Sequence, residues 1–224
     1  MEFKPPFGIF FLMMALPLLI MMTAFLLVGL VNHAFQELGF SPVIAFLLIV
    51  GVLLGSVINI PVWKVRGMKE YHTYDSSFPP KKVKVVSEGA TKVSVNVGGA
   101  VIPAAMSIFL LSRLDEGLYV PLISATILMA LVCYKLARTV EGRGIAMPAL
   151  VPPVLASLTA LIISPHNAAP VAFISGVTGV LVGADLMNMR KVTKVADSIS
   201  IGGAGTFDGI FLTGILSVLL VAIA

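Results

Sequence analysis

Residues 8–31 form an apolar stretch without a single Asp, Glu, Lys or Arg, and several shorter apolar stretches follow it along the chain. A helix needs about 20 mostly apolar residues to cross a bilayer. The chain of 224 residues is 58% apolar and only 12% charged, whereas about a quarter of the residues of a soluble domain are charged. These features predict an all-α polytopic membrane protein. The first stretch is too long for the core of a signal peptide and has no clear cleavage site, so we expect it to remain as a helix.

About seven transmembrane helices are expected, within a single transmembrane domain that covers residues 1–224. The apolar segments place them at 8–31, 42–62, 98–113, 119–138, 148–164, 169–189 and 207–224. The third and fifth segments are short and contain glycine or proline, which makes their ends the hardest to place. The remaining sizeable segment, 63–97, would lie outside the membrane.

The basic residues fall almost entirely on one side of this arrangement. Of the 15 Lys and Arg residues, only Arg113 would lie on the opposite side from the N-terminus and the 63–97 loop. Cytoplasmic loops of membrane proteins are enriched in Lys and Arg. The sequence therefore predicts a multi-pass protein of the cell membrane with a cytoplasmic N-terminus and an extracytoplasmic C-terminus.

The second half of the 63–97 loop has a strand-like pattern. In residues 81–97, Val alternates with Lys, Ser and Asn on both sides of a Ser-Glu-Gly sequence at 87–89. A period of two with a central turn signal predicts a small cytoplasmic β-hairpin. Two roles remain open for it. Its lysines would contact anionic membrane lipid, or its edge strand would receive an extended or unfolded peptide.

Two acidic residues stand out because carboxylates are rare inside the predicted spans. Asp185 lies about one turn before the basic end of the sixth span, and Asp208 lies at the cytoplasmic mouth of the seventh. Two carboxylates a few ångströms apart can share a proton and act as general acid and base on a water that attacks a peptide bond. They could equally hold a cation or relay protons. In a purely structural alternative, Asp208 is favoured by its helix dipole and Asp185 pairs with Arg190.

Small, polar and helix-breaking residues collect on the same predicted side of the membrane. Glycines beside the aspartates indicate either a water-filled cavity or close helix packing. If there is a cavity, the residues expected to bind substrate beside the two catalytic aspartates are Asn59, Asn96, Pro148, Ala149, Leu150, Asn188, Gly205 and Gly209.

Other kinds of chemistry find little support in the sequence. His33 and His166 would lie far from the aspartates, and His72 has no companions at metal-ligand spacing. We therefore expect no metal and no cofactor. Nothing resembles a nucleic-acid-binding module, and a single cysteine, Cys133, cannot form an intrachain disulfide.

The segments GADLMN and SIGGAGTFDGIFLTGILSVLL, together with INIP and GIAMPALVPP, resemble an uncharacterised family of prokaryotic multi-pass membrane proteins that is catalogued as a domain of unknown function. The likeness covers most of the chain. It implies a membrane location and brings no activity with it.

A second likeness is to the intramembrane aspartyl proteases: presenilins, signal peptide peptidases and prepilin peptidases. These enzymes place one Asp on one span and another in a Gly-x-Gly-Asp string that opens the next, an order that Asp185 and Asp208 follow. Phe207 stands where that string has its second Gly, and the Pro-Ala-Leu string at 148–150 precedes the aspartates instead of following them. This likeness implies cleavage of single-span or unfolded substrates. A proton- or cation-coupled transporter or channel and a non-catalytic membrane scaffold remain as alternatives.

Overall fold

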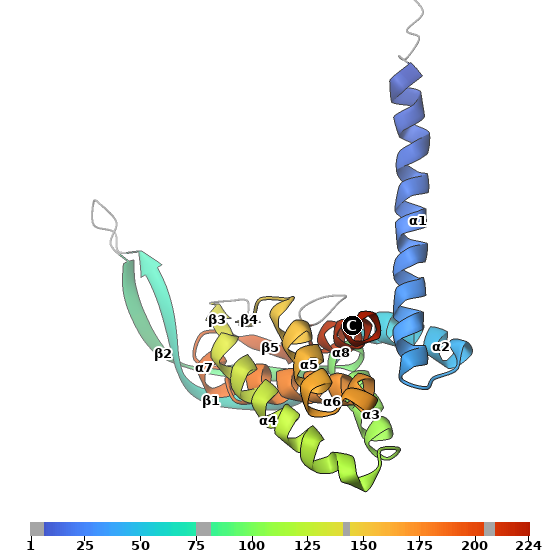
Figure 1. Ribbon diagram of the computed structural model, residues 1–224. Coiled ribbons are helices and arrows are strands. Elements are labelled where there is room, and N and C mark those ends of the chain that lie inside the picture. The colour runs from blue at the N-terminus through green and yellow to red at the C-terminus, as the bar shows by residue number, and fades with distance from the viewer. Residues whose placement is uncertain (1–6, 75–81, 141–143, 204–208) are drawn as a thin grey trace, which may run out of the picture.

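Helices make up most of the chain, and the strands gather at one end of them (Figure 1). The computed structural model describes residues 7–74, 82–140, 144–203 and 209–224. The long helices are α1 (Phe7–Glu37), α2 (Pro42–Gly55), α3 (Ile102–Leu111), α4 (Tyr119–Leu136), α5 (Val151–Ile163), α6 (Ala168–Val180) and α8 (Gly209–Ile223). Two π-helical turns, η1 (Val97–Val101) and η4 (Leu181–Leu186), precede α3 and extend α6, and the short α7 spans Met189–Val192.

Three helical stretches are long and apolar enough to cross a membrane: Leu19–Glu37, Glu116–Leu136 and Pro165–Val192. They indicate a membrane protein, as the sequence predicted. The other apolar helices, of which Val97–Leu111 and Gly209–Ile223 are the longest, have at most 15 residues. At about 1.5 Å per residue they reach roughly 22 Å, less than the roughly 30 Å of a bilayer core. Seven spans are therefore not supported, and three of the described helices are candidates for crossing the membrane by their length and composition.

The second predicted span, 42–62, is only partly helical. Its helix α2 ends at Gly55, and strand β1 begins at Asn59. Asn59 and Pro61 explain the change, because Asn favours caps and turns and Pro cannot donate the hydrogen bond that a helix interior requires. The apolar stretch thus continues beyond the helix as extended chain.

Helix α6 is the centre of the bundle, and α4, α5 and α8 pack around it. Its Phe173 and Val177 are fully buried. Small residues bring the backbones together: a Cβ atom at Gly183, in η4, would lie 2.1 Å from the carbonyl oxygen of Ala130 in α4. Close approach through glycine is a common way for membrane helices to associate.

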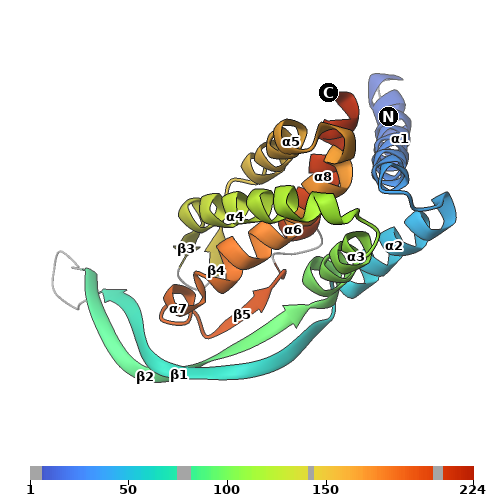
Figure 2. The same ribbon diagram turned by 60° about the horizontal axis from the view of Figure 1, so that its bottom comes forward.

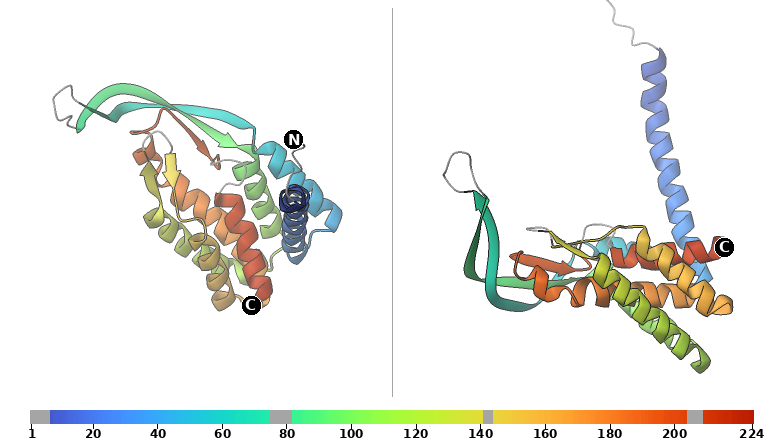
Figure 3. Two further views of the ribbon diagram at one scale, coloured as in Figure 1. Left: turned by 90° about the horizontal axis from the view of Figure 1, so that it is seen from above. Right: turned by 60° about the vertical axis from the view of Figure 1, so that its left-hand side comes forward.

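Helix α1 stands apart from this bundle. It is seen end-on in the left view of Figure 3, where the bundle helices lie lengthwise. Only its C-terminal part joins the core, where Phe35 is fully buried and lies 6.5 Å from the ring of Phe211 in α8.

The main sheet lies across one end of the bundle (Figure 2). Strands β1 (Asn59–Tyr74) and β2 (Lys82–Asn96) form a long antiparallel hairpin, and β5 (Ser198–Ile201) pairs in parallel with Lys92–Val95 of β2. The strand order is β1-β2-β5, while β3 (Arg138–Val140) and β4 (Gly144–Ala146) form a separate two-stranded sheet.

The chain forms a hairpin, but not the one predicted within residues 81–97, because that segment is a single strand, β2, paired with β1. Residues 87–89 lie inside β2 and pair with 67–69 of β1, and the segment that joins the two strands falls outside the described residues. Gly89 has a packing role instead of a turn role. A Cβ atom there would lie 2.7 Å from Cδ of Lys69, so the glycine makes room for that side chain to cross the hairpin.

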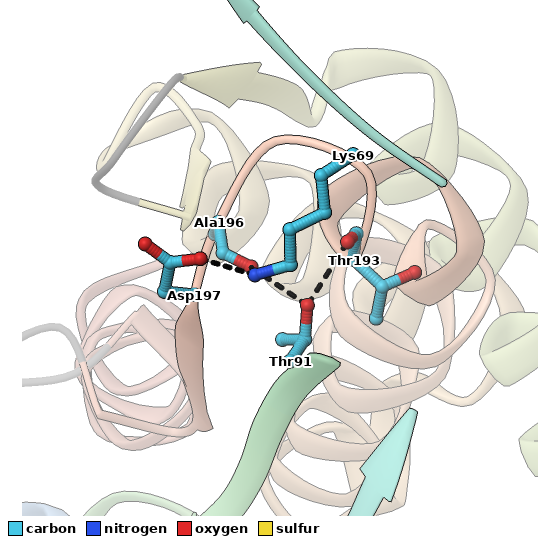
Figure 4. Close-up of polar contacts among 5 residues, drawn as sticks. All are labelled: Lys69, Thr91, Thr193, Ala196 and Asp197. Atoms are coloured by element: carbon cyan, nitrogen blue, oxygen red, sulfur yellow. Dashed lines mark hydrogen bonds and ion pairs between the residues drawn. The ribbon is translucent and has the colours of Figure 1, made fainter. Parts of the chain in front are cut away.

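Lys69 fastens the hairpin to the turn that precedes β5 (Figure 4). Its side chain is 2% exposed, and its Nζ donates to the carbonyl oxygen of Ala196 at 3.2 Å and forms an ion pair with Asp197. The hydroxyl of Thr91 lies 2.7 Å from the same carbonyl oxygen and 2.9 Å from that of Thr193. Two backbone bonds, from Glu70 N–H to Lys194 and from Lys92 N–H to Asp197, complete the attachment. We call these contacts the hairpin clamp.

Candidate functional site

A polar pocket lies at the end of the bundle where the sheet meets η4. Its volume is about 400 Å³, which falls within the usual range for small-molecule sites. Among the described residues that line it, Asp185 is the only charged one. The lining is formed by Asn59, Ser94, Gly144, Ile145, Asp185, Met189, Val192, Ser198, Ile199, Ser200, Ile201 and Gly203.

Asp185 is held at this pocket by an irregular helix. It lies in the π-helical turn η4, where the helix is locally widened, and such turns occur frequently at functional sites. Its side chain is half-buried, and its Oδ2 accepts a hydrogen bond of 3.3 Å from the N–H of Gly202. Gly202 has a φ of +69°, a conformation that favours glycine. The carboxylate is thus tied to the residue that directly follows β5.

Asn59 forms part of the opposite wall, at the start of β1. Its Oδ1 accepts hydrogen bonds from the hydroxyl of Ser200 at 2.5 Å and from Nδ2 of Asn96 at 3.2 Å. Ser94, on the strand between them, donates its hydroxyl to the carbonyl oxygen of Ile199 at 3.1 Å. The pocket therefore combines one carboxylate with amide and hydroxyl oxygens, a lining suited to a ligand that donates hydrogen bonds.

Asn96 makes structural hydrogen bonds between α2 and η1. It is 1% exposed and does not line the pocket. Its Oδ1 caps η1 by accepting from Gly99 N–H at 2.7 Å, and its Nδ2 also donates to the carbonyl oxygen of Ser56 at 2.7 Å. It therefore joins the end of α2 to the start of η1 and α3.

Asn96→Ala is expected to lower the free energy of unfolding by about 2 kcal/mol, because a helix cap and a buried carbonyl partner are lost together. Thermal unfolding of the detergent-solubilised protein measures this loss. Asn59→Ala is the matched control. Asn59 is exposed, so its substitution changes the wall of the pocket without removing a buried side chain. A larger loss of stability in Asn59→Ala would contradict the assignment.

Asn188 also serves the helices and not the pocket. Its buried Nδ2 donates to the carbonyl oxygens of Gly183 at 3.1 Å and Ala184 at 3.2 Å, which belong to η4. Its Oδ1 accepts from Nζ of Lys191 at 2.9 Å, and that ammonium lies 4.4 Å from the ring of Tyr134. Asn188 thus satisfies backbone groups of the π-helical turn that carries Asp185.

The remaining predicted binding residues are not brought to Asp185 within the described chain. Pro148, Ala149 and Leu150 are exposed in the turn before α5, and the pocket reaches only Gly144 and Ile145 of that segment. Gly209 is the first residue of α8 and does not line the pocket. Gly205 and Asp208 lie outside the described residues, so the carboxylate pair remains a prediction.

Sequence reasoning missed the serines of the pocket. Ser94 and Ser200 face each other across the parallel pairing of β2 with β5, and Ser198 pairs opposite Lys92. The alternation Ser-Ile-Ser-Ile at 198–201 is a strand signal that was available. Its partner strand, however, lies about 100 residues earlier, and no local pattern identifies such a pairing.

In the parts of the chain that the structure describes, no group of three His, Cys, Asp or Glu side chains could hold a metal ion.

Comparison with known proteins identifies a family but no activity. The family model described as "Protein of unknown function (DUF1614)" matches residues 53–220. No curated protein and no solved structure matches the chain. The matched range starts near the end of α2 and includes the hairpin and every described residue of the pocket. The likeness to intramembrane aspartyl proteases therefore rests on the sequence motifs alone.

Proposed function

The chain belongs to the DUF1614 family, and from this premise we propose that it is a membrane protein that binds a small organic cation in the pocket around Asp185. The single observation that carries this proposal is the lining of the pocket. One carboxylate is its only charge among the described residues, and Asn59 and several serines line the same pocket. An ammonium or guanidinium group carries both the charge and the hydrogen-bond donors that these oxygens require.

The position of Asp185 strengthens the proposal. It lies within Pro165–Val192, one of the stretches able to cross a membrane. A carboxylate in such a stretch is costly and usually functional. Close to the membrane the effective dielectric constant is lower than in water, which strengthens its attraction for a cation. The backbone bond from Gly202 orients the carboxylate at the pocket.

We place this pocket on the cytoplasmic side of the membrane. The supporting observation is the location of the basic segments. The hairpin, β3 and α7 lie at the same end of the bundle (Figure 2), and they carry Lys64 and Arg66, Arg138, and Arg190 and Lys191. Residues of β1 and α7 also line the pocket. Cytoplasmic segments carry an excess of Lys and Arg.

The proposal predicts that small organic cations stabilise the protein through Asp185. Thermal unfolding of the purified protein would be followed with ethanolamine, agmatine and spermidine as probes. A probe present at about 100 times its Kd adds about 2.7 kcal/mol to the free energy of unfolding. Asp185→Asn keeps the shape of the side chain and removes its charge, so its affinity should fall at least about tenfold, which corresponds to about 1.4 kcal/mol.

Asp115→Asn is the matched control, because Asp115 is an exposed carboxylate in the loop before α4. It should keep the affinity of the unmodified protein. Equal stabilisation of the unmodified protein and Asp185→Asn would mean that the probes bind elsewhere. The absence of stabilisation by all three probes would contradict the proposal.

A second candidate is the aspartyl intramembrane protease. The observation in its favour is that the pocket wall extends to Gly203, five residues before Asp208 in the chain. In this hypothesis Asp185 and Asp208 activate a water that attacks a peptide bond of a single-span substrate. Cleavage of single-span substrates in proteoliposomes tests it, since both Asp185→Asn and Asp208→Asn must abolish cleavage. Retention of cleavage in either variant would refute the two-aspartate mechanism.

A further inference from the structure

An exposed apolar segment joins helix α2 to the hairpin. Val57, Ile58, Ile60, Val62 and Trp63 are all exposed, Ile60 at 48% and Trp63 at 42%. They continue the exposed apolar surface of α2, which includes Phe46, Leu47, Leu53 and Leu54. Because α2 belongs to a membrane protein and is too short to cross the bilayer alone, this continuous surface needs an apolar environment beyond the end of the helix.

A bulge directs the largest of these side chains to one face of the hairpin. In the register Ile60 pairs with Val95, and after the irregularity between Pro61 and Trp63, Trp63 pairs with Val93. Residues opposite each other in an antiparallel pair lie on the same face of the sheet. Ile60 and Trp63 therefore share the face on which Val93 is fully buried against the helical core. At the start of the outer strand β1, Ile60 and Trp63 remain exposed on this face, whereas Val65 farther along packs against the core.

The other face of β1 is cationic. Lys64 pairs with Lys92, and Arg66 pairs with Ala90, and all three basic side chains are exposed. Two lysines directly opposite each other repel, which is unfavourable unless anions or water surround them. The start of the hairpin is thus an amphipathic strand, with an apolar face directed toward the helical core and a cationic face directed away from it.

Two features exclude other surroundings for this strand. Among the described strands β1 lies at the edge of its sheet, so one row of its backbone groups has no strand partner there, and lipid-exposed sheet edges do not occur in the hydrocarbon region. Addition of a peptide strand is disfavoured as well, because Pro61 lacks a donor and the bulge and the charges interrupt the edge. The interface between hydrocarbon and water supplies water for the unpaired backbone groups and an apolar layer for the exposed side chains. Trp is enriched in this region of membrane proteins.

We propose that residues 57–63 form an interfacial anchor that lies in the headgroup region of the phospholipid bilayer. The indole of Trp63 and the side chain of Ile60 contact the upper part of the acyl chains, while Lys64 and Arg66 remain among water and phosphate groups. The strand lies parallel to the membrane plane and extends the apolar surface of α2 sideways. This anchor does not depend on the identity of the ligand in the pocket.

Trp63 is the only tryptophan of the chain, so its fluorescence reports directly on the depth of the anchor. The full-length protein would be placed in liposomes that contain a nitroxide-labelled phospholipid, with the nitroxide at the headgroup, near the top of the acyl chain or at the bilayer centre. We expect the two shallow labels to quench Trp63 at least about twofold more than the deep label. Iodide in the water phase should quench it only weakly.

A variant with Trp63→Phe and Met68→Trp supplies the matched reference. Met68 is exposed at 56% and lies on the face of Lys64 and Arg66, farther along β1. Its tryptophan should be quenched by iodide and not by the lipid labels. For Trp63 itself, strongest quenching by the deep label would overturn the anchor, as would quenching by iodide alone. Protection from both lipid labels and iodide would also overturn it and would identify a second copy of the chain as the covering surface.

Discussion

Gly98→Ala is expected to lower the free energy of unfolding by at least about 3 kcal/mol, one of the largest effects that a single methyl group can produce in this protein. A Cβ atom at Gly98 would lie 2.1 Å from the carbonyl oxygen of Val52 and 2.5 Å from the amide nitrogen of Ser56. Both atoms belong to the backbone at the end of α2, so no side-chain rotation can relieve the clash. Helix α2 would have to separate from η1 and open the Asn96 bridge between them.

Thermal unfolding and size-exclusion chromatography of the detergent-solubilised protein measure this effect. Gly51→Ala, in the same helix pair, is the matched control. A Cβ atom at Gly51 would lie 3.6 Å from Cδ1 of Ile102, an ordinary contact. Since Ala is the better helix former by about 1 kcal/mol, this variant should be as stable as the unmodified protein or slightly more so. Equal losses in the two variants would show that the close approach at Gly98 is not what destabilises the protein.

Lys69→Ala is expected to release the hairpin from the clamp, at a cost of about 3 kcal/mol to the local stability of that attachment. The substitution removes a buried aliphatic stem that lies over Gly89, together with the ammonium bonds to Ala196 and Asp197. The ion pair contributes only a small part of this cost, because the Asp197 side chain is 78% exposed and water screens its charge. Helices α4 and α6 should remain folded, since no atom of the clamp lies in them.

Hydrogen exchange measured by mass spectrometry separates this local release from global unfolding. The amides of Glu70 and Lys92, which donate to Lys194 and Asp197, should exchange about 100-fold faster in Lys69→Ala. Lys64→Ala is the control, because Lys64 is exposed on the other face of the same strand. Lys69→Met keeps the stem and removes the charge, so its intermediate effect isolates the contribution of the ammonium. Unchanged exchange at Glu70 and Lys92 in Lys69→Ala would contradict the clamp.

Composition and the length of the apolar segments were sufficient to predict a helical membrane protein. Hydropathy alone could not separate spanning helices from short ones, because it measures the apolar character of a segment and not its conformation. Residues 42–62 show the difference: most of the segment is apolar, yet the helix ends at Gly55 and β1 begins at Asn59. The Ser-Glu-Gly sequence at 87–89 was misinterpreted for a related reason. Its glycine accommodates the side chain of Lys69, a requirement that only tertiary structure reveals.

The candidate site was predictable only in part. Asp185 and Asn59 were identified because polar groups are rare in apolar segments, and both line the pocket. Asn96 and Asn188 were selected for the same reason, but their amides are used to satisfy backbone carbonyls at helix junctions. A buried amide that binds a ligand and one that caps a helix give the same signal in a sequence. The serines of β5 required knowledge of which strand β5 pairs with, and that pairing is non-local.

The parallel pairing of β5 with β2 also sets the order in which the chain can assemble. The ribosome completes the hairpin about 100 residues before it reaches Ser198, which at about 5 to 20 residues per second is a delay of about 5 to 20 s. During that interval helices α3 to α6 are made, while β5 is not yet present to pair with Lys92–Val95 of β2. The part of the pocket lining that β5 supplies is also missing. The site is therefore among the last parts of the protein to form. A chain that stops before Ser198 contains most of the bundle and Asp185 but cannot form the pocket.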